Sequence, residues 1–185
     1  MESPDKVPLT RSLRGRLWLA YFAGLATLPL AAMVAAYIGL FPIDAVSRPP
    51  GLETAIGQRA LSAALASRSR GLANPVQPGD ERALLSGMQL FRRDCAGCHG
   101  DVHGDSPWGA HDFYPRVPQF WSNPIALTPA EAYVAIHYGI RYSGMAAWHG
   151  LLADDEIWQA ANFVSAMHHL PASVDREWRN PSTEP

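Results

Sequence analysis

An uncharged run of 25 residues near the amino terminus restricts the fold more than any other feature of this chain. The run, residues 17–41, reads LWLAYFAGLATLPLAAMVAAYIGLF. As a helix rising about 1.5 Å per residue it would be roughly 37 Å long, which is enough to cross a bilayer with some tilt. Pro29 lacks a backbone donor, so we expect a kink near the middle. The run therefore predicts a single transmembrane helix at residues 17–41.

Charges on the two sides of this run predict its orientation. Basic residues precede it at positions 6, 11, 14 and 16, whereas Asp44 follows it before the next basic residue, Arg48. The positive-inside rule then places residues 1–16 in the cytoplasm and the rest of the chain on the outer side. A cleaved signal peptide is the alternative, with a cut near Ala35-Ala36. The apolar run continues past that point to Phe41, which favours a retained anchor.

Composition supports a membrane segment joined to an acidic domain. Hydrophobic residues make up 48% of the chain and charged residues only 17%. Residues 1–79 carry eight Lys/Arg and four Asp/Glu, whereas residues 80–185 carry seven and thirteen. This sign argues against nucleic-acid binding. It is compatible equally with a solvated surface and with docking to a partner that has a basic patch.

Residues 42–79 form a predicted linker with its own helix. Proline and glycine at positions 42, 49, 50 and 51 indicate an extended connector, and those at 71, 75, 78 and 79 mark a second boundary. Between them, residues 53–70 are good helix formers, and Ile56, Leu61 and Leu65 fall on one apolar stripe. We interpret this as a helix that packs on the following domain or lies near the membrane. The alternative is a surface for a partner subunit.

Three more helices follow, each with a recognisable boundary. Asp80 is a suitable N-cap for a helix that we expect to run through Phe91 to about residue 94. The sequence Thr128-Pro129-Ala130-Glu131 is a capping box with proline at the first helical position, and Gly139 is the expected stop. Residues 154–155 begin the last helix, which ends before Pro171. The chain between residues 101 and 127 has no clear periodicity and reads as ordered loops.

Both cysteines of the chain lie in one pentapeptide, Cys95-Ala96-Gly97-Cys98-His99. This is the C-x-x-C-H attachment motif of a c-type haem, in which two thiols form thioethers and the histidine binds the iron. A zinc site is an alternative, and it would need further ligands such as His103 and His111. A thioredoxin-like redox motif would need a surrounding βαβ pattern, and no strand-rich segment is visible.

Residues 80–171 resemble a class I cytochrome c domain. Residues 87–101, GMQLFRRDCAGCHGD, resemble the family's first helix and haem site, and residues 139–148, GIRYSGMAAW, resemble its distal-methionine loop. Residues 154–171 resemble its last helix. The resemblance implies an all-α chain: a class I cytochrome c fold around one covalently bound haem c, preceded by the transmembrane helix and the linker helix. Residues 172–185 lie outside it and read as a polar, mobile tail.

The resemblance also implies the ligands. Cys95 and Cys98 would carry the haem, and His99 and Met145 would bind the iron from opposite sides. A thioether is a soft, neutral donor that favours ferrous iron. The rival ligands are His149, His137, His103 and His111, and His149 is the foremost of them because it lies four residues from Met145.

Further positions follow from the same resemblance. The carbonyl of Pro118 would accept the Nδ1–H of His99, with Pro115 as the alternative acceptor and Phe120 packed near the ring. By their place near the methionine loop alone, and not from the resemblance, we hypothesise that four residues line the haem pocket or reach the propionates: Arg141, Tyr142, Trp121 and Trp148.

Helix packing is implied too. Gly87 and Phe91 share a helix face that would cross the last helix, where Trp158 and Phe163 would supply aromatic partners.

A histidine–methionine pair leaves no open coordination position, which favours one-electron transfer over catalysis at the iron. The leading hypothesis is a membrane-anchored monohaem cytochrome c that transfers electrons between respiratory complexes on the periplasmic face of a bacterial inner membrane. The alternative is a fixed haem c subunit of a larger membrane oxidoreductase, such as a terminal oxidase, a nitric-oxide-reductase-type complex or a dehydrogenase. Its partners would then be complex subunits. A haem sensor or peroxidase would need a displaceable sixth ligand or a second C-x-x-C-H, which is absent.

Overall fold

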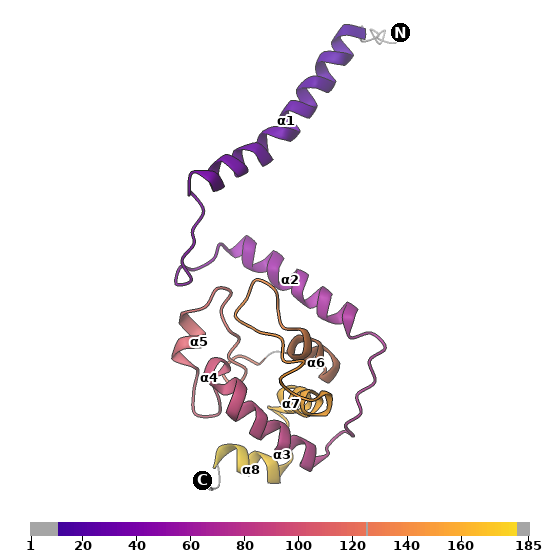
Figure 1. Cartoon of the computed structure of the whole chain (residues 1–185), viewed down its shortest axis with the longest axis vertical. Helices are drawn as coiled ribbons and strands as arrows, with labels where there is room; N and C mark the ends of the chain where they lie inside the picture. Colours follow the sequence, from indigo (N-terminus) through magenta and orange to yellow (C-terminus); the bar gives the residue numbers. More distant parts are fainter. Residues whose placement is uncertain (1–10, 125, 181–185) are drawn as a thin grey trace, which may run out of the picture. The chain divides into compact units, whose positions relative to one another are not determined.

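The computed structural model describes residues 11–124 and 126–180, and within them it contains helices and no strand. The chain forms two compact units, residues 1–43 and residues 44–185, which are described separately (Figure 1). The predicted all-α class is confirmed for the described residues.

The first unit is one apolar helix, α1, at Arg11–Tyr37. Within Leu13–Tyr37, a stretch of 18 residues has a mean hydropathy of 1.8 and is not buried by the rest of the chain, so by length and composition the helix can span a membrane or serve as a signal sequence. Pro29 lies inside it, as expected. Of the predicted cytoplasmic segment, residues 1–10 lie outside the described residues, and residues 11–16 form the first turns of α1.

The apolar helix ends four residues before the apolar run does. Gly39 adopts the left-handed conformation with φ +76°, and the N–H of Leu40 donates to the Ala35 carbonyl at 2.9 Å. This is a glycine-based helix stop that satisfies carbonyls of the last turn. Apolar composition alone therefore places the end of the helix four residues too late, because backbone geometry at Gly39 decides where it ends.

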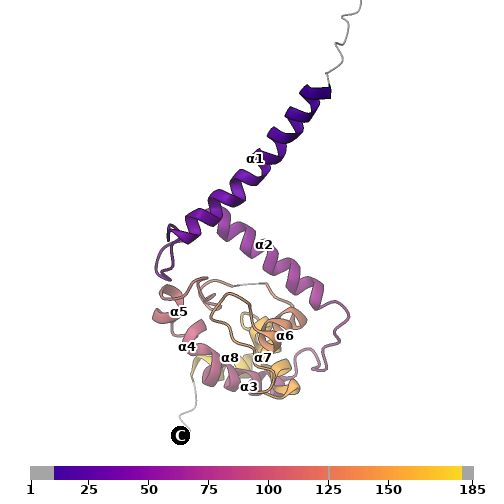
Figure 2. The same ribbon diagram turned by 45° about the horizontal axis from the view of Figure 1, so that its top comes forward.

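The second unit consists of helices and connecting loops (Figure 2). Their bounds are α2 Gly51–Arg68, α3 Glu81–Leu90, a π-helical turn η1 Phe91–Cys95, α4 Ala96–His99, α5 Pro107–His111, α6 Pro129–Tyr138, α7 Asp154–Ala166 and α8 Ala172–Arg179. Helix α7 packs against both α3 and α6 and so forms the centre of the unit.

The predicted helix boundaries are confirmed at atomic detail. The Asp80 side chain accepts from the Ala83 N–H at the start of α3. At the start of α6, the Thr128 hydroxyl accepts from the Glu131 N–H and the Glu131 carboxylate accepts from the Thr128 N–H. Gly139 ends α6 with φ +66°. Short-range sequence patterns are sufficient to predict these helix ends, because each of these caps uses groups within one helical turn.

Two apolar clusters hold the unit together. The first joins α6 and α7 and includes Leu65 of α2. The second joins α3, η1, α7 and α8, and its buried members are Met88, Phe91, Phe163, Met167 and Trp178.

Residues 172–179 are not part of the polar, mobile tail that the sequence predicts for residues 172–185. Residues Ala172–Arg179 form α8, in which Val174 and Trp178 are both fully buried. These two residues are four apart and share one helix face, whereas the other face is charged. A composition average hides this pattern, because two apolar side chains are enough to dock two turns of helix. The folded domain therefore extends beyond Pro171 to Arg179, and residues 181–185 lie outside the described residues.

Helix α2 packs on the domain that follows it, in agreement with the first of the two interpretations. Leu65 joins the first cluster, and the Arg68 guanidinium lies 5.7 Å from the centre of the Tyr138 ring. At its other end, the Glu53 carboxylate accepts from the Tyr114 hydroxyl. The predicted apolar stripe is used only in part, since Ile56 is 61% exposed.

Candidate functional site

The C-x-x-C-H pentapeptide begins at the end of the π-helical turn η1 and continues through the short helix α4. Cys95 ends the π-helical turn, and Cys98 and His99 belong to the short helix α4. Gly100 ends this helix with φ +69°, and a Cβ there would lie 2.7 Å from the Gly104 carbonyl oxygen. The chain therefore turns back directly after His99, with no room for a side chain at the turn.

The His99 ring is held in one tautomer. Its Nδ1 lies 2.9 Å from the Pro118 carbonyl oxygen, and because a carbonyl only accepts, Nδ1 carries the proton. Nε2 then has a free lone pair. The Phe120 ring stacks on the imidazole with centroids 4.5 Å apart and planes 6° apart. Burial lowers the pKa of His99, an effect that the Pro118 hydrogen bond partly opposes. The ring is therefore neutral, the form that binds metal ions.

Pro118 is thus positioned as the resemblance implies, and Pro115 is not. The Pro118 carbonyl reaches His99 across 19 residues of sequence. Pro115 follows a cis peptide bond with Tyr114 and is exposed.

The two thiols are free and partly buried. Burial, together with the nearby Asp94, raises the pKa of the Cys95 thiol to about 12, so that it is protonated at neutral pH. Within the part of the chain that the structure describes, no group of three His, Cys, Asp or Glu side chains is arranged to hold a metal ion. The zinc alternative, which relies on His103 and His111, therefore has no structural support.

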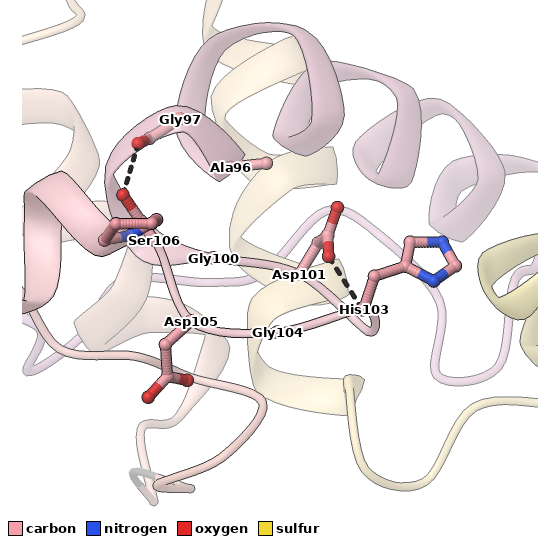
Figure 3. Close-up of a pocket in the computed structure, with 9 residues that line it drawn as sticks. Ala96, Gly97, Gly100, Asp101, His103, Gly104, Asp105 and Ser106 are labelled. Atoms are coloured by element: carbon pink, nitrogen blue, oxygen red, sulfur yellow. Dashed lines mark hydrogen bonds between the residues drawn. The ribbon is translucent and has the colours of Figure 1, made fainter.

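A network around Gln119 fixes the loop that follows the motif. The buried Gln119 amide accepts from the Ser106 N–H at 2.8 Å and donates to the Cys98 carbonyl at 3.0 Å. The Ser106 hydroxyl donates to the Gly97 carbonyl at 2.6 Å and also caps α5 (Figure 3). The sequence analysis missed both residues. Ser106-Pro107 carried a signal, because serine before proline is typical of a helix start, whereas Gln119 carried none.

Replacing Gln119 by leucine is expected to lower the free energy of unfolding by about 1–3 kcal/mol, since buried backbone groups at Ser106, Cys98 and Val117 would lose their partner. Urea unfolding of the full chain in detergent, followed by circular dichroism, measures the loss. Gln58→Leu, at an exposed position of α2, is the matched control and should change the value by less than about 0.5 kcal/mol. Equal effects of the two substitutions would contradict a structural role for Gln119.

Met145 lies in a tight loop after α6. The Met145 N–H donates to the Ser143 hydroxyl at 3.1 Å, and the Met145 carbonyl accepts from the Ile140 N–H at 3.0 Å. Tyr142 has φ +61°, which is unusual for a residue with a side chain. The Met145 side chain is partly buried and packs beside the first apolar cluster. The loop therefore holds Met145 through its own backbone contacts.

The segment after the motif touches both Cys98 and the methionine loop. A Cβ on Gly109 would lie 1.8 Å from the Cys98 carbonyl oxygen, so α5 lies directly on α4. A Cβ on Gly144 would lie 2.5 Å from the Phe113 ring, so the methionine loop closes on the same segment. Cys98 and Gly144, which are 46 residues apart in sequence, therefore both contact the segment at residues 109–113.

Two of the rival histidine ligands have other partners. The His137 Nδ1 lies 3.0 Å from the Tyr133 hydroxyl and 3.5 Å from an Asp154 carboxylate oxygen. Its ring stacks on His149 with centroids 5.2 Å apart. Burial, followed by the effect of Asp154, raises the pKa of Tyr133 to about 12. These contacts form a polar cluster between α6 and the start of α7.

The four residues predicted near the propionates do not form one cluster. Trp121 stacks on His168, with the Arg179 guanidinium 5.1 Å from its ring centre. Trp148 packs against the first apolar cluster. Arg141 and Tyr142 are exposed. Their contact with a haem remains a prediction.

The donor set fits a covalently bound haem c. Two thiols have the required spacing, and the adjacent imidazole is neutral with Nε2 free. A soft thioether donor, Met145, lies on the loop that closes on the same segment. Cys95, Cys98, His99 and Met145 would therefore hold the group.

One of three comparisons with known proteins matches the region that contains this site to a family. Residues 82–164, somewhat less than half of the chain, match the family described as cytochrome C oxidase, cbb3-type, subunit III. The comparison with curated proteins returns no match. Among solved structures, the chain is similar to the Kuenenia stuttgartiensis reducing HAO-like protein complex Kustc0457/Kustc0458, at 24% identity and a TM-score of 0.43 over 52% of this chain and 47% of that one. Residues 82–164 of this chain are therefore similar to the cytochrome c domain of the cbb3-type subunit III family.

Proposed function

We propose that this protein is a membrane-anchored carrier of single electrons, with its cytochrome c domain on the periplasmic side of a bacterial inner membrane. A cytochrome c domain implies electron transfer. The observation that carries the proposal is the His99 imidazole, fixed by Pro118 and stacked on Phe120 beside two thiols. Bound there, haem c supplies an iron that changes oxidation state by one electron.

Contacts within the chain hold both candidate iron ligands in place, so that electron transfer would need little rearrangement of the protein. Pro118 and Phe120 hold the imidazole in one tautomer and one plane. The Ser143 and Ile140 contacts hold the Met145 loop. Because both axial ligands would be preset, little structural change accompanies a change of charge. A closed His99/Met145 pair would also exclude exchangeable ligands, which separates a carrier from a sensor or peroxidase.

Met145 as the sixth ligand is tested by absorption spectra of the full-length protein. We expect a low-spin spectrum with a weak near-infrared methionine–iron band, unchanged when carbon monoxide is added to the reduced form. Met145→Ala should remove that band and let carbon monoxide bind. Met167→Leu, a volume-conserving change at a buried methionine, is the control and should leave both properties intact. Carbon monoxide binding by the unsubstituted protein would contradict a closed site.

A fixed subunit of a larger oxidoreductase is the second candidate. Helix α2 packs on the cytochrome c domain, so the chain between α1 and the second unit is short. Residues 38–43 reach only about 20 Å when fully extended. On α2, Leu52 and Ile56 stay exposed at 73% and 61%. The matching family is itself described as an oxidase subunit.

Purification from a native membrane in mild detergent distinguishes the two candidates. A fixed subunit should co-purify at constant ratio with a larger membrane protein, and Ile56→Asp on α2 should reduce that ratio. A mobile carrier should purify alone, with Ile56→Asp having no effect.

A further inference from the structure

Trp108 is an exposed aromatic side chain beside the cysteine motif. It lies on α5 and is 56% exposed, whereas its neighbour Gly109 is buried against the Cys98 carbonyl. A large aromatic ring costs free energy when it is left in water. Helix α5 is already capped by Ser106 and docked through Gly109 without the exposed part of this ring.

Contacts connect Trp108 to both parts of the haem site. Its ring packs edge-on against Phe113 with centroids 4.6 Å apart. The Phe113 ring in turn touches Gly144, the residue before Met145. Through Gly109, the same helix touches Cys98. Trp108 is therefore a surface residue one contact away from the cysteine motif and two contacts away from the methionine loop.

The sequence around Trp108 is mostly acidic, and Arg116 is the basic residue closest to Trp108 along the chain. No lysine or arginine occurs between Arg93 and Arg116, whereas Asp101, Asp105 and Asp112 lie in this interval. Asp105 and Asp112 are exposed on either side of α5, and the Asp105 carboxylate points away from Ser106 and Gly97 (Figure 3). The Arg116 guanidinium donates hydrogen bonds to carbonyl groups, including those of Ala45 and Phe113.

We infer that Trp108, flanked by Asp105 and Asp112, is the docking surface for a redox protein with a basic contact face, and that electrons cross the protein boundary there. This inference rests on the proposed electron-transfer function. A central aromatic with charged residues around it is the usual anatomy of a protein contact. Acidic side chains at its edge would steer a basic partner and speed encounter.

The probe is a mitochondrial cytochrome c in which zinc replaces iron and whose surface is lysine-rich. Its photoexcited triplet state gives one electron to the ferric domain, which becomes ferrous, and the zinc porphyrin becomes a cation radical. No bond forms or breaks. The second-order rate constant is read from the decay of the triplet state, with the full-length protein in neutral detergent.

Asp112→Asn is expected to lower this rate constant about two- to threefold at low ionic strength and to have no effect near 1 M salt, where the charges are screened. Asp155→Asn removes the same charge from an exposed position at the start of α7 and is the matched control. It should change the rate constant much less.

Trp108→Ala is expected to lower the rate constant about fivefold at both ionic strengths, because it removes contact area as well as a short path, and Trp108→Phe should restore most of the loss. Reduction by ascorbate, a small molecule, serves as the separate readout of the proposed function. If ascorbate reduces every variant but Trp108→Ala and Asp112→Asn react like the unsubstituted protein, the docking surface is wrong and the carrier function stands. If the unsubstituted protein accepts no electron from ascorbate, the proposed function itself fails.

Discussion

Substitution of Trp178 by alanine is expected to lower the free energy of unfolding of the cytochrome c domain by about 3–5 kcal/mol. The Trp178 side chain is fully buried, with its ring 5.9 Å from that of Phe91 and 5.1 Å from that of Phe163. Arg92 holds the same helix by donating to the Glu177 and Trp178 carbonyls at 2.6 and 2.8 Å. Removing the ring leaves a cavity where α3, α7 and α8 meet.

Urea unfolding of the full chain, followed by far-ultraviolet circular dichroism, measures this effect. Trp108→Ala is the matched control, because the same substitution at an exposed position removes little buried area and should cost less than about 1 kcal/mol. Trp178→Phe should cost less than Trp178→Ala. It keeps an aromatic ring, and it removes an indole N–H that is buried without a hydrogen-bond partner. A loss below about 1 kcal/mol for Trp178→Ala would show that α8 does not belong to the domain core.

Gly87→Ala should cost about 3 kcal/mol or more, although alanine is the better helix former. A Cβ at position 87 would lie 2.1 Å from the Gln159 carbonyl oxygen and 3.0 Å from the Phe163 Cβ. The first contact is with backbone, which cannot rotate away, so α3 and α7 would have to separate. Because these helices carry both the second cluster and the approach to Cys95, loss of haem attachment should accompany the loss of stability.

Gly57→Ala provides the control on an exposed helix. Nothing lies within 4 Å of a Cβ at that position, so the substitution should stabilise the chain by about 0.5–1 kcal/mol through helix propensity and reduced unfolded-state entropy. If Gly87→Ala lowers the free energy of unfolding and Gly57→Ala raises it, the steric effect at Gly87 is separated from the effect of helix propensity. If Gly87→Ala were neutral, the close approach of α3 and α7 would be contradicted.

The local part of the fold was predictable because its causes are local. The Asp80 cap, the Thr128–Glu131 capping box and the Gly139 stop each depend on groups within a few residues of one another. The all-α class and the cytochrome c resemblance likewise rest on contiguous motifs. The π-helical turn at Phe91–Cys95 had no such signal, because one extra residue in a turn leaves the composition unchanged.

Aromatic pairing was only half predictable, for a geometric reason. Phe163 does pack against Phe91, with centroids 5.6 Å apart, whereas Trp158 stacks on Tyr133 in the other cluster at 4.2 Å. Residues five apart on a helix point about 140° away from each other, so they cannot share one partner face. The sequence identified both residues as packing residues but not which cluster each would join.

By itself, the sequence determined the apolar helix, the C-x-x-C-H motif, the helix caps and the identity of the candidate ligands, because spacing and short-range chemistry specify these. Only the tertiary structure decided that residues 172–179 belong to the core, that Gln119 secures the motif and that Trp108 and Phe113 connect the surface to the methionine loop. Each of these depends on contacts between segments distant in sequence. Such contacts depend on how helices pack, and no local pattern along the chain encodes that.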